Sequence, residues 1–163
     1  SAPAGVRFVA HLAIYSGGCA GALSVTAKPG VFGPAPILFV HGDADDYAYL
    51  SDCKIYAQRI SAAGTPTEVV VLPGARHKFD VDDPKRVNAR NNPKTKEGCP
   101  LEYDVVDFKF RDRRNGDVLS PDAMQTLNRD LCADKGATLE GNLKAREAAG
   151  KAVMEFLGKV LKS

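Results

Sequence analysis

The 163-residue sequence has little excess charge and no long apolar segment. Its 22 basic and 20 acidic residues leave a formal net charge of +2, and both signs are interspersed along the chain. This balance gives no reason to expect nucleic acid or an anionic membrane as a partner. No apolar run approaches the roughly 20 residues of a transmembrane helix, so we expect no membrane span. The amino end also lacks the charged and apolar regions of a signal peptide.

The four cysteines lack the C-x-x-C spacing of redox motifs and zinc sites, so we expect neither a metal nor a cofactor. Cys19, Cys53, Cys99 and Cys132 are widely separated. An even, scattered set suits two disulfides in a periplasmic or secreted protein, and four buried thiols in a cytoplasmic protein are the alternative. Of the three possible pairings we favour Cys19 with Cys53, at neighbouring strand and helix ends, and Cys99 with Cys132, which bracket one insertion.

The residues that are present predict a single α/β domain. The segment Pro36 to Tyr47 (PILFVHGDADDY) is an apolar run too short for a helix and is broken by glycine and acidic residues, which indicates a buried parallel strand followed by a loop. Glu68 to Leu72 (EVVVL) is a second such strand. Between them, residues 48–63 carry apolar side chains at helical spacing and end at Gly64, as expected for a crossover helix.

The remaining segments extend this architecture at both ends. Val6 to Tyr15 is β-rich and predicts the first strand, with His11 in a core position. Asn142 to Leu161 predicts an amphipathic helix that covers one face of the sheet. The polar stretch from about 80 to 120 predicts a surface insertion, and the Asn115-Gly116 pair within it predicts a small β-hairpin.

Asp45 and His77 are the candidate catalytic residues. Each follows a predicted strand, and in parallel sheets the chemistry lies beyond the carboxyl ends of the strands. An acid and a histidine there suit the second half of a nucleophile–acid–histidine triad. Asp43 and Asp46 compete for the acid position, although Asp46 better suits a helix cap. The alternative, non-catalytic interpretation is that Asp45 is a turn residue that caps the following helix and that His77 is a surface histidine in a turn.

Three segments of the sequence resemble the dienelactone hydrolase branch of the α/β-hydrolase superfamily. HGDADD (residues 41–46) resembles the acid turn of that family and PGARHKFD (73–80) its histidine turn, and FVAHLAIYSGGC resembles the preceding strand. The resemblance implies a partial α/β-hydrolase fold containing the last three strands of the sheet. It also implies Asp45 as the triad acid and His77 as the triad histidine.

The nucleophile elbow of that family, G-x-S-x-G or G-x-C-x-G, has no clear counterpart. It belongs upstream of Arg7, so the chain resembles the carboxyl-terminal half of such a hydrolase. Gly17 to Gly21 contains a literal G-x-C-x-G after a strand. However, Lys28-Pro29-Gly30 leaves no room for the long helix and the further strand that must follow an elbow. We therefore interpret Cys19 as a loop cysteine in a disulfide rather than as a nucleophile.

The resemblance predicts a hydrolase of small esters or lactones whose nucleophile comes from an upstream segment. The alternative is a non-catalytic remnant of an α/β-hydrolase that serves interaction or oligomerisation. A sheet cut in half leaves an unpaired strand edge, so we expect a homo-oligomer or association with a chain that completes the sheet.

Overall fold

A three-stranded parallel sheet forms the centre of the computed structural model, which describes residues 6–19, 30, 32–104 and 106–162. Its strands β1 (His11–Ile14), β2 (Ile37–Gly42) and β3 (Thr67–Leu72) lie in the order β1-β2-β3. The predicted α/β class with a parallel sheet is confirmed. The first strand is shorter than the predicted Val6 to Tyr15, because pairing with β2 begins where the His11 amide donates to the Pro36 carbonyl.

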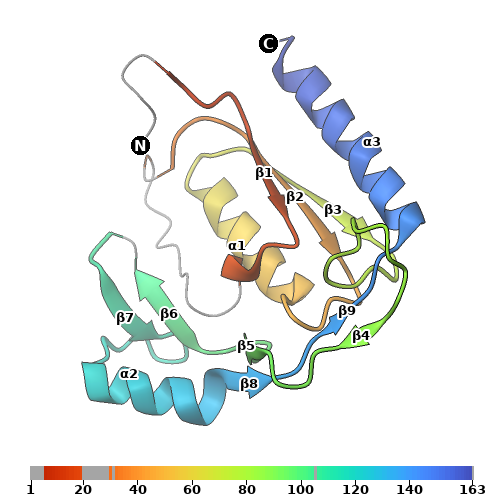
Figure 1. Ribbon diagram of the computed structural model, residues 1–163. Helices are drawn as coiled ribbons and strands as arrows, with labels where there is room; N and C mark the ends of the chain where they lie inside the picture. The colour runs from red at the N-terminus through yellow and green to blue at the C-terminus, as the bar shows by residue number, and fades with distance from the viewer. Residues whose placement is uncertain (1–5, 20–29, 31, 105, 163) are drawn as a thin grey trace.

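One helix covers each face of the sheet (Figure 1). Leu38 and Val40 of β2 pack with Ala149 and Phe156 of α3 (Leu143–Val160). Phe39, which alternates with them, packs against Ala57 and Ile60 of α1 (Leu50–Ala62). These contacts explain the continuous apolar run in β2, because both of its faces are buried.

The helices begin and end near the predicted positions, but not every side chain lies where the sequence predicts. Tyr49 occupies the N-cap of α1 without a side-chain cap, and Ser51 in the first turn donates to Glu97 at 2.6 Å. Asn142 caps α3 by accepting from the Ala145 amide. Leu143, the first residue of this helix, is 62% exposed and so lies outside its buried apolar face. His11 is also exposed rather than part of the core.

Residues 80–142 form an excursion beyond the carboxyl ends of the sheet strands (Figure 1). Its short strands pair antiparallel, β4 (Val87–Asn88) with β9 (Thr138–Leu139), β5 (Pro93–Thr95) with β8 (Ala133–Lys135), and β6 (Leu101–Asp104) with β7 (Lys109–Asp112). The chain thus runs out along β4 and β5 and returns along β8 and β9. The helix α2 (Pro121–Leu127) continues as a π-helical turn, η2 (Asn128–Cys132), and a short 3₁₀ turn, η1 (Gly17–Cys19), follows β1.

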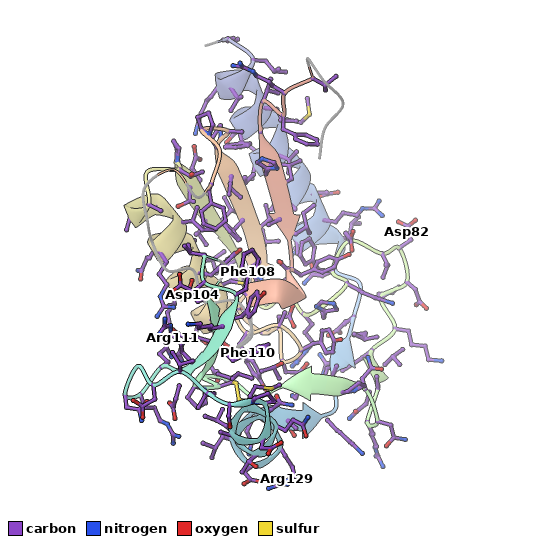
Figure 2. All side chains as sticks on the ribbon, turned by 90° about the vertical axis from the view of Figure 1, so that its left-hand side faces the viewer. Asp82, Asp104, Phe108, Phe110, Arg111 and Arg129 are labelled. Atoms are coloured by element: carbon purple, nitrogen blue, oxygen red, sulfur yellow. A yellow bond between two sulfur atoms is a disulfide. The ribbon has the colours of Figure 1, made fainter. Side chains whose placement is uncertain are left out.

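Two successive antiparallel pairings stand where one hairpin was predicted. Strands β6 and β7 pair first, with Leu101 opposite Asp112 and Asp104 opposite Lys109. Asp104 stabilises this pairing, since its carboxylate accepts from the Val106 amide and lies 3.5 Å from the Arg111 guanidinium. Figure 2 shows Asp104 and Arg111 side by side on the hairpin. The predicted Asn115-Gly116 turn then reverses the chain after β7, because the Asp112 amide donates to the Asp117 carbonyl and the Leu119 amide donates to the Phe110 carbonyl, on either side of the bridge between Arg111 and Val118.

Both favoured disulfides, Cys19–Cys53 and Cys99–Cys132, are present. The first ties the turn after β1 to the first half of α1, and the second ties the start of β6 to the end of η2. Stable disulfides indicate an oxidising compartment. In the described part of the chain, no helix has both the length and the apolar character of a membrane span.

Candidate functional site

Two turns meet at the carboxyl end of the sheet, the acid turn (residues 43–49, after β2) and the histidine turn (73–79, after β3). Backbone hydrogen bonds join them directly, because the Ala44 amide donates to the Ala75 carbonyl at 3.1 Å. The Asp43 carboxylate adds a bond, since it accepts from the Gly74 amide at 2.6 Å. Gly42 permits this approach, because a Cβ there would collide with the Ala75 carbonyl. The fold therefore fixes the two turns against each other.

Asp45 is buried between these turns with both carboxylate oxygens engaged. Its Oδ1 accepts from the amides of Tyr47 and Ala48, each at 2.9 Å. Its Oδ2 lies 2.9 Å from Nδ1 of His77. Burial alone would raise the pKa of Asp45, but the hydrogen bonds from His77 and the two amides hold that pKa below its usual value of 3.8. Asp45 is therefore an ionised acceptor for the Nδ1–H of His77.

Replacing Asp45 with asparagine should lower stability in a pH-dependent way. Because the folded-state pKa is depressed, the carboxylate stabilises the fold above its unfolded pKa, and this contribution disappears as pH falls through the folded value. We expect Asp45→Asn to lower the free energy of unfolding by roughly 1–3 kcal/mol near pH 5 and by progressively less below about pH 4. Urea unfolding of both proteins from pH 5 to pH 2.5 measures the difference. If the two proteins differ in free energy of unfolding by the same amount across this range, Asp45 is not an ionised acceptor in the folded protein.

His77 is held by contacts on its backbone and its ring. Its carbonyl accepts from the Glu140 amide at 3.1 Å, so the end of the excursion is hydrogen-bonded to the histidine turn. The rings of Tyr15 and Tyr47 contact the imidazole, each with a centroid separation of 4.7 Å. The side chain of His77 is 12% exposed. With Nδ1 committed to Asp45, Nε2 is the ring nitrogen left for a proton transfer.

The other predicted candidates do not join this pair. Asp46 does not cap α1, because its carboxylate accepts from the amide and the hydroxyl of Thr138 at 2.7 and 2.8 Å. Cys19 carries no free thiol, since it is disulfide-bonded. Within the described residues, no hydroxyl or thiol is hydrogen-bonded to His77, and no group of three or more potential ligands could hold a metal ion. In the part of the chain that the structure describes, the site thus pairs a buried carboxylate with an imidazole to which no hydroxyl or thiol is hydrogen-bonded.

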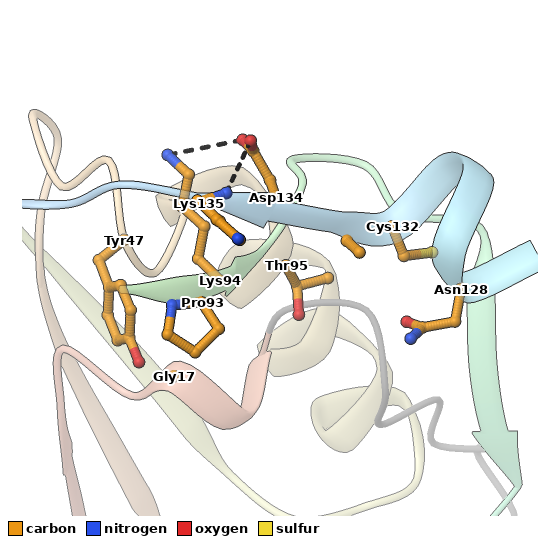
Figure 3. Close-up of a pocket in the computed structure, with 10 residues that line it drawn as sticks. Gly17, Tyr47, Pro93, Lys94, Thr95, Asn128, Cys132, Asp134 and Lys135 are labelled. Carbon is orange, nitrogen blue, oxygen red and sulfur yellow. Dashed lines mark hydrogen bonds and ion pairs between the residues drawn. The ribbon is translucent and has the colours of Figure 1, made fainter. Parts of the chain in front are cut away.

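A cavity of about 510 Å³ lies between the acid turn and the excursion (Figure 3). Tyr47 forms one end of it, and the same tyrosine ring contacts His77. Lys94 of β5 fastens the opposite wall to the acid turn, because its ammonium donates to the Asp46 carbonyl at 2.7 Å and to the Tyr49 hydroxyl at 3.0 Å. The lining also includes Gly17, Pro93, Thr95, Asn128, Cys132, Ala133, Asp134 and Lys135.

Sequence reasoning missed Tyr15, Tyr47 and His41 as parts of this site. Tyr15 directly follows β1 with a positive φ of 36°, and its ring contacts that of His77. Tyr47 lies within the acid turn. His41 precedes that turn in a buried strand, and a polar ring in such a run was the one available signal. No sequence signal pointed to Lys94, because its contact with the acid turn depends on the path of the excursion.

No protein-family model matches the chain, and no curated protein or solved structure is significantly similar to it.

Proposed function

We propose that this chain supplies the acid and the base of a hydrolase that acts on small esters or lactones, in the manner of dienelactone hydrolases. The observation that carries the proposal is the 2.9 Å contact between Oδ2 of the buried Asp45 and Nδ1 of His77. Each residue follows a parallel strand, which is where hydrolase triads place these two groups. The nucleophile, a serine or a cysteine, comes from a segment outside the described residues.

The mechanism follows from the two nitrogens of His77. Nε2 takes the proton of the nucleophile as it attacks the ester carbonyl, and the resulting imidazolium is stabilised by Asp45. The imidazolium then returns the proton to the departing alkoxide, which leaves an acyl-enzyme. In the second half, Nε2 takes a proton from water, which attacks the acyl group, and the nucleophile recovers its proton as it leaves. The cavity beside Tyr47, about 510 Å³, suits a small substrate.

The edge of β1 is where we propose that the missing segment docks. Within the described residues, β1 pairs only with β2. Tyr15, directly after β1, contacts the ring of His77. A parallel strand added to the free edge of β1 would end at this level, which would bring its following turn toward His77. An upstream segment, another chain or a second copy of this chain could complete the sheet.

A non-catalytic interaction domain is the second candidate function, and a surface observation favours it. Val6, Phe8 and Val9 are between 56% and 63% exposed, and Leu12 of the neighbouring strand is 42% exposed. Apolar side chains beside an unpaired strand edge are typical of an association surface. This function needs no reaction at His77. Either candidate fits a periplasmic or secreted protein, as the two disulfides suggest.

Completing the sheet tests the catalytic proposal. We expect the purified chain alone to hydrolyse p-nitrophenyl acetate and a small lactone at the background rate, because no nucleophile meets His77. Joining a segment that carries a strand followed by a G-x-S-x-G or G-x-C-x-G elbow to the amino end should produce turnover. A completed protein that remains inert would favour the interaction domain. His77-dependent turnover by the isolated chain would show a local nucleophile and contradict the proposal.

A further inference from the structure

His41 is a buried histidine that the proposed reaction does not use. It is the penultimate residue of β2, directly before Gly42, and is only 1% exposed. It lies two residues after Phe39 and therefore on the same face of the strand, and Phe39 packs against α1. Its ring therefore lies on the α1 side of the sheet, beneath the acid turn. A buried imidazole requires a hydrogen-bond partner, and this one has a partner in the acid turn itself.

The contact of His41 fixes which of its nitrogens carries a proton. Nε2 lies 2.6 Å from the Ala48 carbonyl oxygen, which can only accept, so Nε2 must carry a hydrogen. The same nitrogen lies 3.6 Å from Oδ2 of Asp45, the oxygen that meets His77. His41 thus directs a bound N–H toward the acid turn.

Ala48 transmits this contact to the carboxylate. Its carbonyl is held by His41, and its amide donates to Oδ1 of Asp45 at 2.9 Å. The position of Ala48 therefore sets the orientation of the carboxylate plane, and that plane decides whether Oδ2 faces Nδ1 of His77. In the described part of the chain, His77 and His41 are the basic side chains within 4 Å of the Asp45 carboxylate. The nearby Arg76 instead contacts the Ala44 carbonyl and Glu140.

We infer that His41 is a positioning residue for the proposed catalytic pair, holding Ala48 so that Asp45 accepts the Nδ1–H of His77. The inference rests on the proposed function, because it assigns His41 a part in presenting that pair. His41 contacts neither the reacting atoms nor the cavity lining. It acts by fixing the tautomer of His77, with the hydrogen on Nδ1 and the lone pair on Nε2.

The tautomer of His77 is the readout, measured through ring-nitrogen chemical shifts at a pH where the imidazole is neutral. The chain has three histidines, so the spectrum contains at most three rings. His11 is exposed on β1 and serves as an internal reference for an unconstrained mixture of tautomers. In the wild type we expect His77 to be almost entirely the Nδ1–H form.

Variants at position 41 separate the hydrogen bond from the packing. His41→Leu keeps an apolar volume and removes the donor, so the His77 signal should shift to the mixture shown by His11. His41→Gln places an amide N–H near the position of Nε2 and should restore the Nδ1–H form. If His41→Leu does not fold, His41→Asn replaces it, because its shorter amide cannot reach the Ala48 carbonyl. A folded Leu or Asn variant with the wild-type tautomer, or a folded Gln variant without it, overturns the inference.

Asp45→Asn distinguishes failure of this inference from failure of the proposed function. If wild-type His77 shows no preference for the Nδ1–H form, or keeps that form in Asp45→Asn, the pair itself is absent and the proposed function fails as well. If the tautomer depends on Asp45 and not on His41, only the positioning role is wrong. Far-ultraviolet circular dichroism of each variant verifies that the sheet and helices remain folded.

Discussion

Replacing His77 with alanine in the completed hydrolase should lower kcat by roughly 10⁴ to 10⁶-fold. The alanine has no ring nitrogen, so the nucleophile keeps its proton and the leaving alkoxide receives none. KM should change little, since Tyr47 and Lys94 of the cavity wall remain in place. Steady-state hydrolysis of a p-nitrophenyl ester measures both constants.

The partner residue and a matched control sharpen this expectation. Asp45→Asn should reduce kcat by about 10⁴-fold, because the amide favours the wrong tautomer of His77. Met154→Ala removes an exposed side chain from α3, away from the site and from the edge of β1, and should leave kcat unchanged. Combining Asp45→Asn with His77→Ala should lower kcat little further than His77→Ala alone, since the two residues act as one unit. Independent, multiplying losses would contradict a shared proton-transfer role.

The sheet and its two helices were predictable because each rests on a local pattern. Both faces of β2 are buried, so Ile37 to Val40 form a continuous apolar run. Gly64, with a φ of 96°, ends the α1 segment as expected. The length of β1 was not predictable from its own residues, because it is set by where β2 begins on the neighbouring strand.

The meeting of Asp45 and His77 was predictable for a geometric reason. They follow adjacent parallel strands, β2 and β3, whose carboxyl ends lie at the same edge of the sheet. Asp46 was misassigned because its partner, Thr138, lies 92 positions further along the chain. Long-range contacts of this kind leave no periodic signal in the sequence.

The excursion was the least predictable region, because few of its elements have a local reason to form. Strands β4 and β9 contain two residues each and depend on pairing across about 50 positions. Its interior is a small cluster of Cys99, Leu101, Leu127 and Cys132, and half of these residues belong to one disulfide. That cluster is separate from the two cores that flank the sheet.

Replacing Cys99 and Cys132 with alanine should therefore unfold residues 99–132 locally while the sheet stays folded. A cluster of this size cannot offset the conformational entropy of more than 30 residues without the cross-link. We expect amide protection to disappear from β6, β7 and α2 and to persist in β2 and β3, as measured by hydrogen exchange. Trypsin should then cleave after Arg113, Arg114 or Arg129 in the otherwise native protein.

The Cys19–Cys53 pair provides the matched control. The two disulfides have sequence separations of 34 and 33, so the chain-entropy contribution is nearly equal, about 3–4 kcal/mol for each. Cys19 and Cys53 lie within the core between the sheet and α1. Their replacement should therefore lower the free energy of global unfolding and leave residues 99–132 protected. If both double variants lose global stability equally and neither opens locally, the excursion folds together with the sheet rather than as a separately stabilised unit.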